Sequence, residues 1–553
     1  AVDAVIGQPR LAAEGERILT GASSHDELAV ALADKPLAGH DLKSLGGGRH
    51  GLLAAAAREG VELGLEHDTM LAAYLLEPQR RTYELTELAA DAGIGLAEGA
   101  AAKGDDKEDD GQLSLGEEVE AGLDPAEEAR LVAALAEDQA PRVIGLGLES
   151  LMREVELPLI AVLAAMEREG LRLDAKRLAE VGAGFGARID QLETEIYELA
   201  GEEFTIGSPQ QVGRILFEKL ELSRKRRGKT GFSTDARVLQ QIRDEHPIVE
   251  KIESWRELTK LKNTYLDSLP DLIDPGTGRV HTTFNQAATT TGRLSSTNPN
   301  LQNIPIRSDI GRPVRACFVA ADGARLLSAD YSQVELRVLA HVADEQVLKD
   351  VFHAGEDVHA ATAAEVFEIS PDEVDVGQRS KAKMVNFGIV YGLTGFGLAD
   401  RLNIPRKEAE EFVARYLERF PAVRRFREEV VERAQEEGYV TTLMGRRRPI
   451  PELRSGNPNT RRLGERLAVN TVIQGTAADI IKVAMVRCWA RLREEQMATR
   501  LVLQIHDELL FEGPPEEMDA ALELVKHEMT HAYELDPPLE VDAGVGTDWL
   551  GAK

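Results

Sequence analysis

The chain has 553 residues, of which 43% are hydrophobic and 29% charged, so it can form several domains with sizeable cores. No apolar run approaches the ~20 residues of a membrane span, and the opening "AVDAVIGQPRLAAEGER" does not have the pattern of a secretory signal. Cys317 and Cys488 are the only cysteines, which excludes a disulfide scaffold or a thiolate zinc site and fits a reducing cytoplasm. Because the sequence does not begin with Met, we expect it to be a fragment.

The net charge of −30 at pH 7 argues against a polyanionic partner, but this charge is unevenly distributed. Residues 1–150 carry −18 and the remaining 403 carry −12. Basic residues cluster at 223–229, 378–383 and 445–451. Phosphate contacts act over about a Debye length, ~10 Å, so local basic strips still permit DNA binding. The alternative is that each run is an ordinary solvated loop.

The apolar pattern divides the chain into regions. Residues 1–100 alternate short apolar runs with Ala-rich stretches, which predicts an α/β layer structure. The charge-dense stretch at 97–118 predicts a mobile insertion, and a helix follows over roughly 125–150. We place a domain boundary just before Glu154, where a strongly periodic helix begins. Long polar helices are expected over 175–270, with short strands and further helices after 276.

The segment "RLLSADYSQVELRVLAH" at 325–341 predicts a strand followed by a helix. Asp330 lies at the end of the strand, where a carboxylate projects into a cleft. Ser332 and Glu335 have the spacing of a capping box, with Ser332 as the helix cap. From the residues alone, Glu335 is equally well explained as part of the cap or as a functional group.

The segment "LVLQIHDELLFE" at 501–512 predicts a hairpin, because two short apolar runs flank the polar triplet His506, Asp507 and Glu508. The triplet lacks the Gly, Asn or Pro that turns usually contain. Asp330 and Asp507 are each at a strand end and have the oxygen ligands that Mg²⁺ prefers. Two such ions about 4 Å apart clamp the oxygens of a phosphoryl transfer. The alternative is a chance pair of acids.

The helix "GQRSKAKMVNFGIVYG" at 377–392 carries Arg379, Lys383, Phe387 and Tyr391 at four-residue intervals. Each interval turns only about 40° around the helix, so the four side chains share one stripe. Two cations followed by two aromatic rings match the order of phosphates, sugar and base in a nucleoside triphosphate. An ordinary amphipathic helix is the alternative.

Two further segments carry rows of amide and guanidinium donors. Such donors can test the geometry of a base pair in the minor groove, where every correct pair presents acceptors. Hydrogen bonding between helices is the alternative. The first row lies in "ERLAVNTVIQGTAADIIK" and the second in "TGRLSSTNPNLQNIP"; together they contain Arg466, Asn470, Gln474, Arg293, Gln302 and Asn303.

These segments, in this order, resemble the motifs of family A DNA polymerases of the bacterial polymerase I large-fragment (Klenow-like) type. "DYSQVELR" is similar to motif A, "RSKAKMVNFGIVYG" to motif B and "QIHDELLFE" to motif C. The "TTTGRLSSTNPNLQNIP" and "QGTAADIIK" segments are also typical of the family. The resemblance covers about 154–553 and implies a multidomain α/β and α+β fold. It implies an exonuclease-like α/β domain at 1–153 and a right-hand polymerase at 154–553, with a thumb near 175–270, a palm containing an antiparallel sheet near 276–340 and 451–553, and helical fingers near 340–450.

The resemblance also implies a DNA-templated DNA polymerase that extends a primer 3′-hydroxyl with deoxynucleotides and releases pyrophosphate. Asp330 and Asp507, with the Tyr331 carbonyl, would hold two Mg²⁺ ions, which Mn²⁺ can replace, and Lys383 would join them in catalysis. The expected partners are primer-template DNA and dNTPs, and the expected state is a monomer in the bacterial cytoplasm, associated with the nucleoid in replication and repair.

Other roles follow from the resemblance alone. Glu335 would exclude a ribose 2′-hydroxyl, and Glu508 would support the metal site. The expected nucleotide-binding residues are Arg379, Lys383, Phe387, Tyr391, Glu335, His359 and Gln333. The expected DNA-binding residues are Arg293, Gln302, Asn303, Arg466, Asn470, Gln474 and His506.

The front region resembles the family's proofreading domain but lacks most of its acids. Asp3 alone stands for the first motif, Leu45 replaces the expected second-motif Asp, and Asp138 survives although Ala134 replaces the expected Tyr. Asp68 is better explained as a helix cap. A lone carboxylate cannot assemble a two-metal site, so we predict a folded, inactive support domain and reject a nuclease.

Two other expectations concern the whole chain. A non-catalytic DNA-binding relative would have lost Asp330, Asp507 or Lys383, and all three are present. We therefore reject that alternative as well. The family's 5′-nuclease domain has no counterpart in this sequence.

Overall fold

The structure is a computed structural model. It describes residues 2–5, 8–11, 24–33, 35–45, 47–97, 123–222, 227–228, 231–304, 311–390, 392, 395–402 and 404–553. The insertion predicted at 97–118 lies almost wholly outside these residues, as do Tyr391 and most of the basic run at 223–229. None of the helices within the described ranges is both long and apolar enough to cross a membrane.

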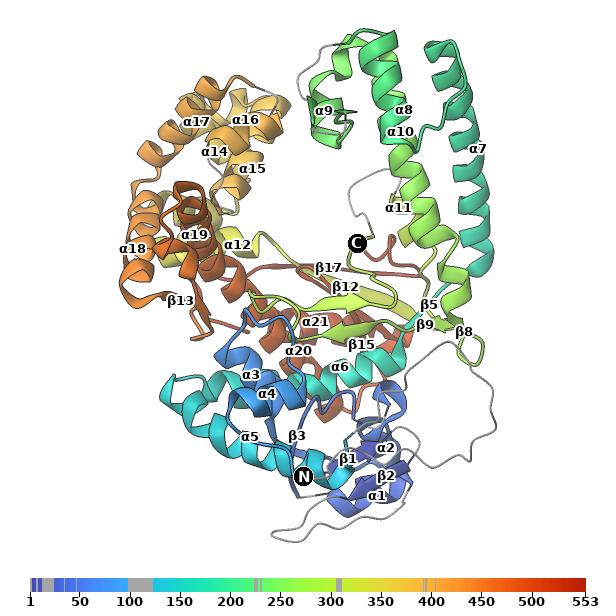
Figure 1. Ribbon diagram of the computed structural model, residues 1–553, viewed down its shortest axis with the longest axis vertical. Coiled ribbons are helices and arrows are strands. Elements are labelled where there is room, and N and C mark those ends of the chain that lie inside the picture. Colours follow the sequence, from blue (N-terminus) through green and yellow to red (C-terminus); the bar gives the residue numbers. More distant parts are fainter. Residues whose placement is uncertain are drawn as a thin grey trace.

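A four-stranded antiparallel sheet lies at the centre of the molecule (Figure 1). Three of its four strands consist mostly of buried apolar residues. Helices α6 (Leu157–Glu169), α20 (Thr476–Glu494) and α21 (Met518–Thr530) pack against the sheet, so few positions on these strands are polar. Leu326, Leu327, Leu510 and Phe511 are among its fully buried side chains. In spatial order the strands are β15 (Arg500–Ile505), β16 (Glu508–Gly513), β12 (Arg325–Tyr331) and β17 (Val541–Gly546).

Two groups of helices rise on opposite sides of this sheet (Figure 1). One group, drawn in green, confirms the long helices predicted over 175–270 and has a small core of its own near its tip. It contains α7 (Ala175–Ala200), α8 (Pro209–Arg214), α9 (Ala236–Gln241) and α10 (Pro247–Leu261). The other, drawn in yellow and orange, contains α14 (Val358–Phe367), α15 (Val376–Val390), α16 (Gly395–Leu402) and α17 (Arg406–Arg419).

The front region lies below the sheet in Figure 1 and mixes helices with short strands, as predicted. Its strands β3 and β4 are parallel, which fits an α/β arrangement. Its elements are β1 (Val2–Val5), β2 (Gln8–Leu11), α1 (His25–Leu32), β3 (Pro36–Gly39), α2 (Leu52–Glu59), β4 (Gly64–Asp68), α3 (Thr69–Leu76), α4 (Leu85–Asp91) and α5 (Pro125–Gly145).

A helix joins the front region to the rest of the chain. It begins with a π-helical turn at Leu151–Glu156 and continues as α6 (Leu157–Glu169). Leu151 and Met152 pack into the front core, whereas Leu163 and Met166 belong to the large core around the sheet. The predicted boundary just before Glu154 therefore falls inside an element that contacts both regions.

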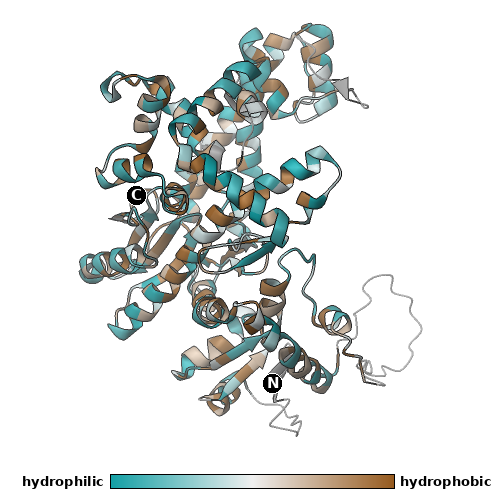
Figure 2. Ribbon diagram, turned by 90° about the vertical axis from the view of Figure 1, so that its left-hand side faces the viewer, coloured by the Kyte–Doolittle hydropathy of each residue, from teal (hydrophilic) through white to brown (hydrophobic). Residues whose placement is uncertain are grey.

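The remaining elements connect these parts. In Figure 2 the long helices carry hydrophilic and apolar stretches side by side, as expected of helices that bury one face. The helices are α11 (Gly311–Arg315), α12 (Val334–Ala343), α13 (Gln346–His353), α18 (Pro421–Glu437), α19 (Pro458–Asn470), α20 (Thr476–Glu494) and α21 (Met518–Thr530). The short strands are β5 (Leu171–Arg172), β6 (Arg227–Gly228), β7 (Gly231–Phe232), β8 (Ile273–Asp274), β9 (Arg279–Val280), β10 (Thr283–Asn285), β11 (Ser295–Thr297), β13 (Tyr439–Thr441) and β14 (Arg447–Pro449).

Candidate active site

The predicted hairpin is confirmed: β15 ends at Ile505, β16 begins at Glu508, and His506 and Asp507 form the turn between them. His506 has φ 52°, the left-handed conformation that usually calls for Gly or Asn. The side-chain amide of Gln504 donates to the His506 carbonyl at 2.5 Å and accepts from Gln302 at 3.1 Å. Side-chain hydrogen bonds therefore help to hold a turn whose residues do not favour it.

Asp330 and Asp507 lie together at the end of the sheet where β12 ends and β15 turns into β16; this end of the sheet is called the Asp330–Asp507 edge below. Asp330 pairs with Glu508 in the β12–β16 register, and the Tyr331 amide donates to the Asp507 carbonyl at 3.1 Å. Burial, with smaller contributions from Glu335 and Asp330, raises the pKa of Asp507 to about 7. Burial also raises the pKa of Asp330. At both carboxyl groups the effect of burial therefore outweighs the compensating charge of Lys553 and, for Asp507, of Arg293.

Glu508 is engaged differently from the two aspartates. Its carboxylate accepts from the Ser328 hydroxyl at 2.7 Å and the Trp549 indole at 2.8 Å, and pairs with Arg315 at 3.5 Å. Burial acts to raise the pKa of Glu508, but Lys553 and these donors outweigh it, and the net shift is downward. Glu508 is therefore a buried, charged group whose oxygens face protein donors.

The side chains at this edge suit hard divalent cations. The Lys553 ammonium lies 2.9 Å from Asp330 Oδ2 and 3.2 Å from Glu508 Oε2, so a positive charge already occupies the space between two carboxylates. In the described part of the chain, no three His, Cys, Asp or Glu side chains are grouped as metal ligands. A Mg²⁺ ion retains several waters and uses one or two carboxylates with substrate phosphates, so the pair Asp330 and Asp507 fits such ions without a third ligand.

The capping box predicted at Ser332 and Glu335 is wrong. Helix α12 begins after Gln333, which has φ 55°, and its start carries no side-chain cap. The Ser332 amide instead donates to the Glu540 carbonyl at 2.9 Å, which holds Ser332 beside the sheet. Glu335 is only 4% exposed and forms an ion pair with Arg293. The side chain of Glu335 is thereby directed to the site rather than to the first turn of its helix.

The predicted stripe on helix α15 is present over its described part. Arg379 is exposed and pairs with Asp357 at 2.6 Å, and Lys383 and Phe387 are half-buried further along the helix. The Phe387 ring lies 5.7 Å from the ring of His359. His359 is 2% exposed and hydrogen-bonds to Asn386 at 3.0 Å. His359 therefore packs beneath the stripe.

Only some of the amide and guanidinium side chains predicted to contact the minor groove lie near Asp330 and Asp507. Asn470 ends α19 and Gln474 lies in a π-helical turn at Thr471–Gly475, so the single regular helix assumed for this row is interrupted. Arg466 is exposed beside Gly392, where an added Cβ would lie 2.9 Å from its side chain. Asn303 is exposed. Arg293 and Gln302 are joined to the site through Glu335 and Gln504, respectively.

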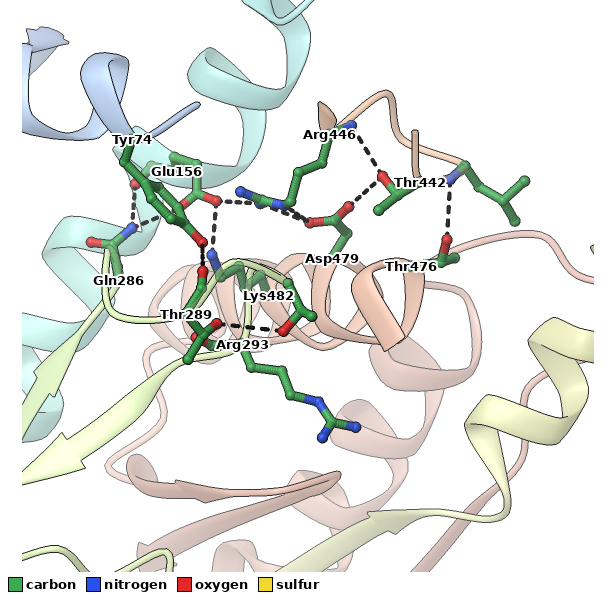
Figure 3. Close-up of polar contacts among 12 residues, drawn as sticks. Tyr74, Glu156, Gln286, Thr289, Arg293, Thr442, Arg446, Thr476, Asp479 and Lys482 are labelled. Carbon is green, nitrogen blue, oxygen red and sulfur yellow. Dashed lines mark hydrogen bonds and ion pairs between the residues drawn. The ribbon is translucent and has the colours of Figure 1, made fainter. Parts of the chain in front are cut away.

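A buried ionic network, which the sequence analysis did not identify, lies beside the site (Figure 3). Arg446 pairs with Glu156 and, at 2.7 Å, with Asp479, while Lys482 pairs with Glu156 at 2.7 Å. All four side chains are almost completely buried. Burial acts to raise the pKa of Glu156, but Lys482 and Arg446 lower it to about 2. The only signal in the sequence was the presence of Asp479 and Lys482 on an apolar helix.

Three further supporting residues were also missed. Arg315, Trp549 and Lys553 contact Glu508, and the Arg315 guanidinium lies 3.9 Å from the centre of the Trp549 ring. Their positions in sequence are far from the turn at His506 and Asp507, and each belongs to a common residue type. No local pattern distinguishes them.

Among the described residues of the front region, the acids are not gathered into a comparable site. Asp68 caps α3 by accepting from the Leu71 amide at 3.0 Å, which confirms the predicted cap. Asp138 pairs with Arg142 at 2.9 Å, and Leu45 packs against the apolar cores. The side chain of Asp3 is outside the described part of the chain.

Residues 175–551 match the family model described as "DNA polymerase family A". The chain is 46% identical to DNA polymerase I of Bacillus caldotenax over 90% of this chain and 56% of the relative. It is 45% identical to the thermostable DNA polymerase I of Thermus thermophilus over 95% of this chain and 60% of the relative. The chain thus spans little more than half the length of these curated relatives.

One similar solved structure is the POL domain of Pol1 from M. smegmatis in complex with DNA primer-template and dNTP. The TM-score is 0.85 and the sequence identity 37%, over 96% of this chain and 90% of that one. The likeness therefore extends over the front region as well as the residues matched by the family model.

Proposed function

The chain belongs to DNA polymerase family A, and on that premise we propose that it is a DNA-templated DNA polymerase. It extends a primer 3′-hydroxyl with deoxynucleotides and releases pyrophosphate. The observation that carries the proposal is the pair Asp330 and Asp507, whose pKa values are both raised at one sheet edge. The similar M. smegmatis protein was solved with primer-template and dNTP, which supports the same partners for this chain.

The architecture we propose follows the right-hand pattern. The central sheet is the palm, the helices at 175–270 are the thumb, and the helices near 340–450 are the fingers. This assignment agrees with two helical groups standing on opposite sides of the sheet (Figure 1). Primer-template would lie between them, above the edge that carries Asp330 and Asp507.

Asp330 and Asp507, with the Tyr331 carbonyl, would hold two Mg²⁺ ions, or Mn²⁺ in their place. Such ions neutralise charge on the attacking and leaving oxygens of phosphoryl transfer. Glu508 would keep Asp330 in position through the neighbouring strand, because its own oxygens are engaged by Ser328, Trp549 and Arg315.

The nucleotide would lie along α15. Arg379 and Lys383 would bind the triphosphate, and the Lys383 ammonium would donate a hydrogen bond to the departing pyrophosphate. Phe387 would stack on the sugar and base, supported from below by His359. Glu335, held by Arg293, would exclude a ribose 2′-hydroxyl, and Gln333 and Tyr391 would complete the pocket.

The duplex would be checked from its minor groove. Arg293, Gln302 and His506 lie beside the Asp330–Asp507 edge or are linked to it by hydrogen bonds, which supports contacts with the primer end. Their side-chain donors can hydrogen-bond to any correct base pair, because every pair presents acceptors in the minor groove. The remaining proposed DNA contacts are Asn303, Arg466, Asn470 and Gln474.

The front region, residues 1–153, is proposed to be an exonuclease-like domain without proofreading activity. Asp138 pairs with Arg142 and Asp68 caps a helix, so both acids are already engaged by protein groups, and within the described residues no three possible ligands are grouped around a metal position. We further propose a monomer that acts in bacterial DNA replication and repair, in the cytoplasm close to the nucleoid.

Primer extension tests the proposed activity directly. The chain is mixed with a primed template, four dNTPs and Mg²⁺, and parallel reactions contain EDTA or ribonucleotides. We expect template-directed extension that needs the metal and prefers deoxynucleotides. A chain that binds the duplex but never extends it would contradict the proposal, and removal of a mismatched 3′ end would contradict the inactive front domain.

A further inference from the structure

The loop that carries Arg293 is held from the front region. This loop joins β10 to β11, and the Thr289 carbonyl within it accepts a hydrogen bond from the Tyr74 hydroxyl at 2.6 Å. Tyr74 lies on α3, is 1% exposed, and is separated from Thr289 by 215 residues. The Thr289 hydroxyl in turn donates to the Arg293 carbonyl at 2.8 Å. Two consecutive hydrogen bonds therefore connect Tyr74 to the backbone of Arg293.

The same loop also contacts the buried ionic network. Gly292 has φ 88°, and a Cβ added there would lie 2.6 Å from Nε of Arg446. Arg446 is itself held by Glu156 and Asp479. The Tyr74 ring centre lies 5.9 Å from the Arg446 guanidinium carbon. Tyr74 and Arg446, which are themselves neighbours, therefore both contact the loop that carries Arg293.

Arg293 leaves the loop on the side away from Tyr74 (Figure 3). Its guanidinium pairs with Glu335, the residue proposed above to exclude a ribose 2′-hydroxyl. A long side chain with a planar charged end has a defined direction only if its backbone is fixed. The position of the Arg293 backbone therefore affects how Glu335 is held.

We propose that Tyr74 is a positioning residue for the polymerase site, acting through Thr289 on Arg293 and Glu335. The inference rests on the proposed polymerase function and assigns the front region a part in nucleotide selection. Burial raises the pKa of the Tyr74 hydroxyl, so it remains a proton donor at all working pH values. Removing the hydroxyl leaves the Thr289 carbonyl without that donor and allows the loop to move.

The test compares Tyr74→Phe with Tyr83→Phe in the full chain. Tyr83 is in the same region, packs edge-on against Tyr74, and donates its hydroxyl to a backbone carbonyl, that of Glu77, at 3.0 Å. Both variants lose one hydroxyl and keep the ring. The kcat and KM for a dNTP and for the matching rNTP are measured at a temperature where both variants are folded. We expect Tyr74→Phe to lower discrimination against the rNTP by three- to tenfold, the range for one hydrogen bond, and Tyr83→Phe to change it less than twofold.

A double-mutant cycle separates positioning from support of the fold. In an Arg293→Ala background, Tyr74→Phe should have no further effect on discrimination, because its route to Glu335 is gone. An equal effect in both backgrounds would overturn the inference, and so would unchanged discrimination in Tyr74→Phe. Should Tyr74→Phe not fold, Thr289→Val cuts the next link, and unchanged discrimination there would also overturn it.

The same assays distinguish this inference from the proposed function. If the wild-type chain and Tyr83→Phe extend primers and Tyr74→Phe matches them in every parameter, only the positioning role fails. If the wild-type chain extends no primer, the proposed function fails and this inference fails with it.

Discussion

Two clusters of charged side chains in this protein are balanced differently. The first contains Glu156 and Asp479 with Arg446 and Lys482, two acids facing two bases. The second contains four acids beside three cations: Lys553 pairs with Asp330 and Glu508, Arg315 with Glu508 and Arg293 with Glu335, whereas no ion pair is formed by Asp507 among the described residues. In the first, the cations hold the pKa of Glu156 at about 2 although it is fully buried. In the second, the pKa of Asp507 rises to about 7.

The difference indicates what each cluster does. A buried ion pair compensates the cost of desolvation only when its charges match, and a matched network is stable without further partners. Carboxyl groups with raised pKa values in a shared site still require positive charge, which is a property of metal and catalytic sites. The first cluster therefore joins parts of the fold, and the second is suited to bind cations.

Asp507→Asn should have the largest effect, since it removes a proposed metal ligand without changing shape. We expect the rate of nucleotide incorporation to fall on the order of ten-thousandfold, because the stabilisation supplied by such ions is several kcal/mol. Single-turnover primer extension measures the rate, and a filter or anisotropy assay should show duplex binding largely kept.

Asp542→Asn is the matched control for this substitution. Asp542 is exposed on β17 and pairs with Asp330 in the strand register, so it tests the loss of any nearby charge. We expect a change of only a fewfold. Equal losses in the two variants, or a near-normal rate for Asp507→Asn, would remove the distinction between the clusters.

Lys482→Met should break the balanced cluster and destabilise the fold. It leaves Glu156 buried with Arg446 as its remaining cation, and such broken pairs cost about 3 to 5 kcal/mol. Chemical denaturation measures the free energy of unfolding. Lys407→Met is the control, because Lys407 forms an exposed pair with Glu411, and its loss should cost under about 0.5 kcal/mol. Comparable losses for both lysines would mean that the buried network has no special structural role.

Glu335→Ala should have an intermediate effect, confined to substrate choice. Gain or loss of a steric contact of this size changes the discrimination between two substrates by about 1 to 3 kcal/mol, or roughly 10- to 200-fold. We expect the ratio of kcat/KM for dNTP over rNTP to fall by that factor. Glu335→Gln, which keeps the bulk and loses the charge, should retain more of the discrimination than Ala does. Unchanged sugar selectivity in both variants would leave Glu335 as a structural partner of Arg293 only.

The helices and strands around the site could be predicted where they depend on the pattern of apolar residues within a short segment. The hairpin at His506 and Asp507 and the strand ending near Asp330 follow from alternating or continuous apolar runs. The helix start at Gln333 was not predictable, because its φ of 55° depends on how Ser332 is held by Glu540. The spacing of Ser332 and Glu335 in the sequence contains no information about that tertiary contact.

The balanced network could not be predicted because its partners are remote in sequence. Glu156 is 290 residues from Arg446 and 326 from Lys482, and only the packing of three separate elements brings them together. The same holds for the link between Tyr74 and Thr289. The order of the motifs identified the family, whereas these long-range contacts are visible only in the folded structure.

The comparison also predicts how the stability of the metal-free protein depends on pH. The pKa of Asp507 is about 7 in the folded state against 3.8 for the free group, so the folded state binds more protons between these values. Stability in EDTA should therefore decrease as pH rises from about 4 to 7, and then level off. Asp68, with a pKa also raised to about 7, contributes in the same direction. Glu156 acts oppositely, because its pKa is about 2 against 4.5, and its contribution is lost as pH falls from about 4.5 to 2.

Denaturation of Asp507→Asn across this range isolates the unbalanced cluster. The variant should lose part of the decrease between pH 4 and 7, keeping the part due to Asp68, and should be more stable than wild type at pH 8 in EDTA. Adding Mg²⁺ at pH 8 should stabilise the wild type more than the variant, because cation binding offsets a repulsion that the variant no longer has. Parallel pH curves for the two proteins would show that Asp507 is compensated in the folded state, and the two clusters would then not differ in kind.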